Sequence, residues 1–356
     1  MRRRRLILTL IFVPLVAIGG WSLVWLLAAR QVQAVFQDWV AARRAAGWQI
    51  SEGPERLTGW PSSAAVEIRG FAISGGGNLL PGGLSWRSQR LVLGLKLSSP
   101  RHLLVVPGGA QHLGLFGGPE LMLTASHLMA RVPMALLPLM TGAGAPPSLV
   151  ASAEGLKIGP AGLDPTLVTA RMLKIEAAPG ASPGSGALSG ALLRAQAAGV
   201  TVGHGKVTSL GPEIGVFSFS GALIGRVPAG PDWALRLGAW RDHGGMVAVR
   251  SLSLVWGPLA VGATGRLVLD QKLQPAGEGT ARVVGYAATL DALASAGRIG
   301  SGVATAAKAL LTLLARPSSA GGPPEVDVPL RLENRTLEVG HIPLIKLPSV
   351  TWASGS

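Results

Sequence analysis

Residues 91–97 read Leu-Val-Leu-Gly-Leu-Lys-Leu, a strict alternation of leucine with other residues. Successive side chains of a β-strand point to opposite faces, so a period of two predicts a half-buried strand rather than a helix. Val92, Gly94 and Lys96 fall on one face of this strand. The other face carries only leucine, and we interpret it as a candidate apolar groove formed by Leu91, Leu93, Leu95 and Leu97.

The same alternation extends outward from this stretch in both directions. It recurs at 64–73, 261–269 and 328–332, where apolar residues alternate with polar or small ones. Short apolar runs separated by Gly, Pro and Ser predict further strands near 102–106, 120–131, 149–158, 167–177, 191–203, 213–224, 233–240 and 247–256.

The composition favours strands and turns over a helix bundle. The 356 residues include 50 Gly and 26 Pro, which both break helix interiors. Strand follows strand with few helices, which predicts a mainly β (α+β) fold with a large antiparallel, curved sheet or two packed sheets. Helical spacing appears at 289–315, and this segment is expected to cover one face of the sheet. An uncovered apolar face needs a second sheet, a helix or a lipid-like ligand.

The amino terminus predicts a membrane anchor. A basic cluster, Arg2–Arg5, precedes the uncharged segment Leu6–Ala29. Roughly 20 apolar residues of helix cross the hydrocarbon core of a bilayer, so this segment is long enough. Trp21 and Trp25 lie toward its far end, where tryptophan favours the headgroup layer, and are candidate membrane-interface anchors. The positive-inside rule keeps the arginines in the cytoplasm and predicts a periplasmic location for the bulk of a bacterial chain.

A cleaved signal peptide is the alternative, since Val32-Gln33-Ala34 fits a small-residue cleavage site. The apolar core of a signal peptide is about 7–15 residues long, which favours the uncleaved anchor. After the anchor, apolar residues at helical spacing predict a juxtamembrane helix over 30–47 that packs on the domain or lies along the bilayer.

The predicted organisation is as follows. The segments are a cytoplasmic cluster (1–5), a transmembrane anchor (6–29), a juxtamembrane helix (30–47), a first strand-rich half (48–177), a Gly-, Pro- and Ser-rich linker or surface loop (178–190), a second strand-rich half (191–350) and a tail (351–356).

The formal net charge of +14 has one local concentration. No acidic residue lies between Glu67 and Glu120. Four basic residues in this interval are candidates for contact with anionic lipid headgroups: Arg87, Arg90, Lys96 and Arg101. The alternative is that they lie on a solvated face of the strands. The charge is otherwise spread along the chain, and the aromatic residues form no base-stacking pattern, so we expect no nucleic-acid partner.

The sequence offers no catalytic or metal-ligand pattern. Absence of cysteine excludes thiolate metal sites, disulfides and cysteine nucleophiles. The six histidines form no HExxH pair, and Asp242-His243 precedes two glycines, which favours a polar turn. We therefore expect no enzyme activity, no cofactor and no metal.

Three stretches carry a resemblance to a known family. They are Gly59-Trp60-Pro61 after the anchor, the region from Leu252 through Trp256-Gly257-Pro258 to Gly297, and the tail from Val328 through Ile342-Pro343-Leu344 to Pro348. Together they resemble a proteobacterial envelope family known as domain of unknown function 2125, over most of residues 5–350. Ser62 and Arg335 depart from the family pattern at two turns. The resemblance implies a location in the envelope and no activity.

Two functions follow from these features. The first is a non-enzymatic, membrane-tethered periplasmic module that binds lipid or another hydrophobic envelope component. The second is a structural or assembly partner of other envelope proteins. Both place the chain at the inner membrane, crossing it once.

Overall fold

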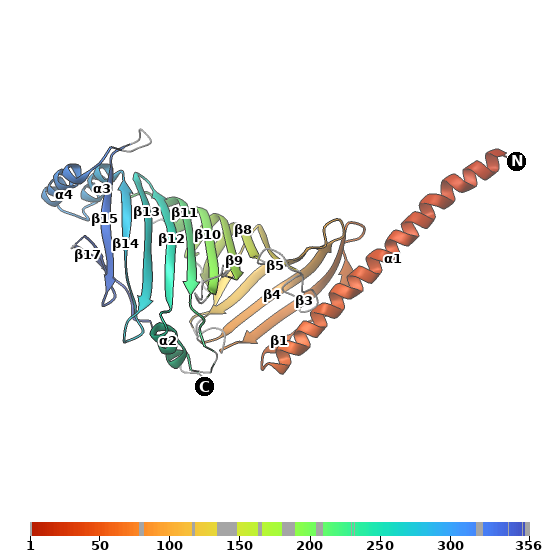
Figure 1. Ribbon diagram of the computed structural model, residues 1–356. Coiled ribbons are helices and arrows are strands. Elements are labelled where there is room, and N and C mark those ends of the chain that lie inside the picture. Colours follow the sequence, from red (N-terminus) through yellow and green to blue (C-terminus); the bar gives the residue numbers. More distant parts are fainter. Residues whose placement is uncertain are drawn as a thin grey trace.

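A computed structural model describes residues 2–77, 82–115, 118–133, 148–162, 166–179, 189–203, 209–228, 230, 232–317, 323–340, 342–350 and 352. Over these residues the chain forms four helices and seventeen strands, and all the strands belong to one sheet (Figure 1). The prediction of a mainly β fold with a large antiparallel sheet is confirmed. Of the two predicted alternatives, one curved sheet or two packed sheets, the structure has the single sheet.

A single helix, α1 (Arg2–Ala45), forms the amino-terminal part of the chain. Its first half projects away from the sheet, and its second half lies along the sheet (Figure 1). Among the described residues, α1 is the one helix that is long and apolar enough to cross a membrane. The predicted juxtamembrane helix is thus the direct continuation of the apolar segment, and it ends just before Gly47.

The first strands lie beside α1. They are β1 (Gln49–Ser51), β2 (Glu55–Thr58), β3 (Ser63–Gly75), β4 (Leu84–Lys96) and β5 (His102–Leu115). The two short strands β1 and β2 pair with the same edge of β3, one after the other. The alternating stretch at 91–97 forms the end of β4, so the strand predicted there is confirmed.

The remaining strands continue in chain order with antiparallel pairing throughout. They are β6 (Leu121–Thr124), β7 (His127–Pro133), β8 (Leu149–Pro160), β9 (Val168–Pro179), β10 (Ser189–Val202), β11 (Glu213–Ile224), β12 (Met246–Trp256), β13 (Leu259–Leu269), β14 (Pro275–Val284), β15 (Glu325–Glu333), β16 (Thr336–Val339) and β17 (Ile342–Lys346). Both β6 and β7 pair with β5 on one side and β8 on the other.

The segment predicted as a linker or loop at 178–190 connects neighbouring strands. Its ends belong to β9 and β10, which pair with each other through Ala178 and Leu192. Residues 180–188 lie outside the described residues. The strands on either side therefore form a hairpin within the sheet, and the division of the chain into two halves stays a prediction.

The strand predicted at 233–240 is wrong, because this segment is the helix α2 (Trp233–Asp242). The side chain of Asp232 caps the helix by accepting a hydrogen bond from the backbone N–H of Leu235 at 3.1 Å. Trp233, Leu237 and Trp240 are buried on one side of the helix, at the spacing of a helical face. They pack against residues of β11, β12 and β13, including Leu223, Val247 and Leu269.

Two helices follow β14, as predicted for 289–315. They are α3 (Tyr286–Ser295) and α4 (Ser301–Leu314), which lie together at one end of β13–β15 (Figure 1). The helix α3 buries Tyr286 and Thr289, whereas α4 leaves most of its apolar side chains exposed. The pair therefore covers an end of the sheet rather than the length of its face.

The main core lies between α1 and the first strands. Val32, Phe36 and Val40 of α1 are buried against β3 and β4. The ring of Phe36 lies 6.1 Å from that of Phe71, measured between centroids. Burial of such side chains stabilises by roughly 1.5–3 kcal/mol each, so this contact holds α1 firmly on the sheet.

Candidate functional site

The leucine face of β4 is closed where we predicted an open groove. Leu91 and Leu93 are buried in the core under α1, and Leu95 packs against the same cluster. Leu97 follows the end of β4. These residues do not form a groove, because the second half of α1 lies on them.

The same face continues across the sheet beyond α1. Directly opposed residues on neighbouring strands point to the same face, so a series of such partners traces one face. Starting from Val66 and ending at β15, every partner in one such series is apolar: Val66, Leu93, Val105, Ala130, Ala151, Ile175, Ala195, Phe219, Leu252, Ala263, Ala281 and Val328. We call the face traced by these twelve residues the apolar face.

The opposite face, which we call the polar face, carries most of the charged side chains, although apolar pairs such as Val92 and Val106 also lie on it. Its cross-strand partners include ion pairs, such as Arg194 with Glu176 at 3.7 Å and Arg282 with Asp327 at 3.0 Å. Arg282 donates through Nε to Asp327, and this hydrogen bond raises the pKa of the guanidinium above its ordinary value. Both faces thus follow the period of two, and the polar one is built to face water.

The apolar face is only partly covered. In β3 and β4 it is sealed, whereas Phe219 and Leu252 are half-buried and Ile175 is 36 % exposed. The described helices other than α1 lie at the ends of the strands, with α2 at one end and α3 and α4 at the other (Figure 1). The middle of β11–β15 therefore stays open between them.

A cavity of about 150 Å³ lies on this open part. It is lined mainly by aliphatic side chains from β12 to β16: Val249, Leu252, Leu267, Leu330, Leu332 and Leu337. Three glycines, Gly265, Gly277 and Gly279, also line it. The cavity is small, open and almost entirely apolar, which suits contact with part of a longer apolar molecule.

The glycines of this cavity allow β13 and β14 to approach closely. Gly265 and Gly279 are direct partners. A Cβ atom added to Gly279 would lie 2.4 Å from the carbonyl oxygen of Thr264, and one added to Gly265 would lie 2.6 Å from that of Glu278. Real Cβ atoms do not come so close to backbone, so these positions require glycine for the observed geometry.

The four predicted basic residues are not gathered at one site. Arg87 forms an ion pair with Glu120 at 2.5 Å, and the side chain of Arg90 lies beside Gly108. Lys96 ends β4, and Arg101 lies in the exposed connection to β5. Arg87 and Lys96 are about 30 Å apart along the strand, at 3.3 Å per residue, so only Lys96 and Arg101 share an end of the sheet.

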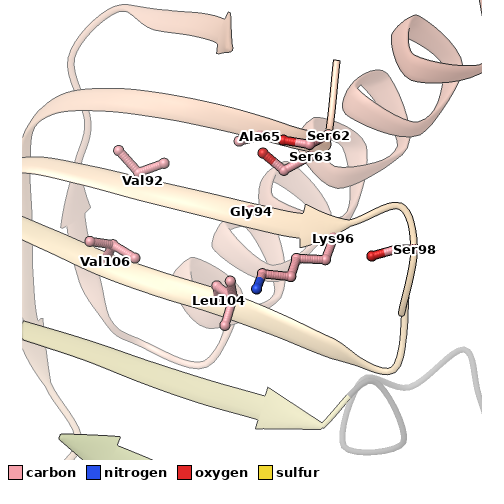
Figure 2. Close-up of a pocket in the computed structure, with 9 residues that line it drawn as sticks. All are labelled: Ser62, Ser63, Ala65, Val92, Gly94, Lys96, Ser98, Leu104 and Val106. Carbon is pink, nitrogen blue, oxygen red and sulfur yellow. The ribbon is translucent and has the colours of Figure 1, made fainter. Parts of the chain in front are cut away.

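A groove of about 400 Å³ lies next to Lys96 on the polar face (Figure 2). Its lining residues come from β3, β4, β5 and their connections: Ser62, Ser63, Ala65, Val92, Gly94, Lys96, Ser98, Leu104 and Val106. The serines lie near the ends of the strands, and Val92 and Val106 lie further along. The side chain of Lys96 extends back along the groove, so that its nitrogen lies beside Leu104 (Figure 2). We call this the Lys96 groove; the sequence had indicated only the shared face of Val92, Gly94 and Lys96.

Trp21 and Trp25 contact the sheet at the place where α1 leaves it. The indole N–H of Trp21 donates to the carbonyl of Pro61, and that of Trp25 donates to the carbonyl of Ser63, each at 2.8 Å. In return, the indole of Trp60 donates to the hydroxyl of Ser22 at 3.3 Å. Residues 59–62, which we call the Trp60 turn, are thus fixed to the middle of α1.

The described residues contain no group of three or more His, Asp or Glu side chains that could hold a metal ion. Asp242 and His243 have separate local partners. A hydrogen bond from Arg241 holds the pKa of the Asp242 carboxyl below its usual range, and His243 Nδ1 lies 2.6 Å from the carbonyl oxygen of Ala239. This pair therefore ends α2 as a polar turn.

Comparison with known proteins gives one match. The family model described as an uncharacterized protein conserved in bacteria (DUF2125) matches residues 25–348, from within α1 to just beyond β17. No curated protein matches, and no solved structure matches. The matched residues include the three stretches on which the resemblance was based, which begin at Gly59, Leu252 and Val328.

Proposed function

Since the chain belongs to the DUF2125 family of uncharacterized bacterial proteins, we propose its function from its structure. It is a membrane-anchored, non-enzymatic module that binds a lipid, or another hydrophobic envelope component, along the apolar face. The residues that contact this ligand are those of the open part of the face, with Phe219, Leu252 and Leu267 near its centre.

The observation that carries this proposal is the unbroken series of apolar partners from β3 to β15. Its eleven steps between strands, at about 4.8 Å each, span roughly 50 Å. Soluble proteins rarely expose an apolar patch of more than a few hundred Å², because apolar surface left in water costs about 25 cal/mol per Å². A ligand with a long apolar chain would cover the open part of such a face.

The helix α1 supports a place for this face next to a bilayer. Its projecting half carries exposed apolar side chains such as Phe12, Leu15 and Ile18. Arg2–Arg5 precede them, and the positive-inside rule favours the cytoplasm for this cluster. We infer that α1 crosses the inner membrane once and that the sheet lies in the periplasm.

A second candidate function rests on α4. Val303, Leu310 and Leu313 are 64 %, 56 % and 84 % exposed, and they lie on a helix that packs only through its other side. Burial of this stripe by another envelope protein would make the chain an assembly partner rather than a lipid binder.

Photo-cross-linking distinguishes the two functions. In the full chain, p-benzoylphenylalanine replaces Phe219 on the apolar face or, as the matched control, Ser220 on the polar face. The lipid-binding proposal predicts lipid adducts at position 219 in cells and none at position 220. Protein adducts at position 219 without lipid adducts would support the assembly function instead.

The position of Phe219 keeps this test independent of the anchor. Seven steps of the partner series separate it from Val66 under α1, or about 34 Å at 4.8 Å per step. Lipid in direct contact with the membrane-spanning half of α1 would therefore not reach this residue, and Ser220, on the opposite face of the same strand, controls for contact with the rest of the bilayer.

A further inference from the structure

We propose that the Lys96 groove binds the anionic headgroup of a phospholipid in the bilayer that α1 crosses. This site lies on the polar face, so it is separate from the apolar face and does not depend on a ligand there. The two proposals share only the membrane-spanning role of α1.

The length of α1 sets the depth of the groove relative to the bilayer. A hydrocarbon core of about 30 Å takes roughly 20 helical residues, which extend from Leu6 to Trp25. Trp21 and Trp25 are the residues that bond to Pro61 and Ser63. The Trp60 turn therefore lies at the bilayer surface, and Trp60 itself, which is 53 % exposed, meets the headgroup layer that favours tryptophan.

The groove begins at this same turn. Ser62 and Ser63 line it directly, and Lys96 is the cross-strand partner of Ser63. A backbone hydrogen bond of 3.2 Å from Leu97 N to Ser62 O ties the end of β4 to the turn. The backbone of Lys96 is therefore held near the bilayer surface, and its exposed side chain extends from there toward Leu104 (Figure 2).

The charge at the groove suits an anion. None of its lining residues is acidic, and none of the ion pairs among the described residues involves Lys96. The nearest acid on the same face along β3 is Glu67, which is paired with Arg69 at 3.4 Å. An ammonium and the hydroxyls of Ser62 and Ser98 are donors of the kind that bind phosphate oxygens, whereas the hydroxyl of Ser63 donates to the carbonyl of Gly59 at 3.2 Å.

The groove also has an apolar floor, on the side away from the bilayer. Val92, Leu104 and Val106 line it beyond the polar end (Figure 2). A volume of about 400 Å³ falls in the range of ligand sites and accepts a headgroup, whose acyl chains extend the other way, into the bilayer.

The test uses the full chain in nanodiscs. Photoreactive phosphatidylglycerol, with a diazirine near the glycerol end of its acyl chain, is cross-linked, and the modified peptides are mapped by mass spectrometry. We expect adducts in the segments 62–65 and 96–98, and about tenfold fewer in Lys96→Glu. Lys96→Arg keeps the adducts, and Lys174→Glu on the polar face of β9 is the matched control that leaves them unchanged.

Three results would overturn the proposal. The first is equal labelling of these segments by photoreactive phosphatidylcholine, which carries no net charge. The second is unchanged labelling in Lys96→Glu. The third is loss of labelling with millimolar glycerol phosphate, which would assign the groove to a soluble phosphate compound. Lipid adducts at position 219 test the apolar face separately, so either proposal can fail alone.

Discussion

Gly279 shows how one residue shapes the open part of the apolar face. Its missing Cβ allows the backbone of β14 to approach Thr264 on β13, where a methyl group would lie 2.4 Å from a carbonyl oxygen. We expect Gly279→Ala to lower the free energy of unfolding by about 1–3 kcal/mol, because the strands must move apart.

Gly262 provides the control for this prediction. It lies on β13 as well, and a Cβ atom added there meets nothing within 4 Å. Thermal unfolding of the two alanine variants in the same detergent measures the difference. Equal melting temperatures would show that the close approach at Gly279 carries no cost.

Leu267 and Val268 are neighbours in β13 that point to opposite faces. Leu267 lines the apolar cavity, and Val268 is 38 % exposed on the polar face. An amide buried without a partner costs roughly 1–3 kcal/mol, so Leu267→Gln should reduce lipid cross-linking at position 219 by about tenfold. Val268→Gln should leave it unchanged, and a loss of cross-linking in both variants would contradict a role for the apolar face.

At the scale of elements, α1 has two functions along its length. Its second half completes the core, and its projecting half is exposed. We expect Phe36→Ala to destabilise the sheet by about 3–5 kcal/mol, since Phe36 is 6 % exposed and contacts Phe71. Val16→Ala, in the projecting half, should leave the unfolding of the sheet unchanged when both are followed by circular dichroism in detergent.

The helix α2 explains why one element was mispredicted. The segment from Trp233 to Leu237 also alternates, with apolar residues at 233, 235 and 237, and this pattern indicates a strand. Leu235 is 74 % exposed, however, and Trp240 is buried instead. The helical cap at Asp232 was the local signal that could have corrected the prediction.

That cap gives a prediction at the same scale. Asp232→Ala should destabilise α2 and its contacts by about 1 kcal/mol, and Asp232→Ser should restore most of this, because serine also caps helices. Differential scanning calorimetry of the two variants makes the comparison. A serine variant as unstable as the alanine variant would exclude the capping role.

Local periodicity predicted most strands, through alternation, and both helices after β14, through helical spacing, because these patterns are encoded by neighbouring residues. It could not predict that α1 covers Leu91 and Leu93. That contact joins residues far apart in the sequence, and no spacing encodes which face a distant helix selects. The Lys96 groove was missed for the same reason, since Ser62, Lys96 and Leu104 come together only through strand pairing.

At the scale of the whole molecule, the sheet has two faces of different composition. One face carries cross-strand ion pairs, and the other carries the apolar series from Val66 to Val328. The helix α1 lies against the strands at one end of this sheet, so a ligand on the open part would lie several strands away from α1 (Figure 1).

The proposed orientation gives a prediction about topology. With Arg2–Arg5 in the cytoplasm, the residues after α1 lie in the periplasm. Alkaline phosphatase fused after Ser356 should then be active. Green fluorescent protein fused at the same position should not fluoresce, because it is exported in an unfolded state. The opposite pair of results would reverse the orientation of α1 and remove the periplasmic location.

The most direct test of the central claim is a photo-cross-linking scan along the partner series in living cells. The cross-linker replaces Ile175, Ala195, Phe219 and Leu252 in turn, with Lys174, Arg194, Ser218 and Ser253 as controls on the polar face. Lipid adducts at all four positions of the first set, and at none of the second, are the predicted result. Adducts that fall equally on both sets, or on neither, would contradict a continuous lipid-binding face.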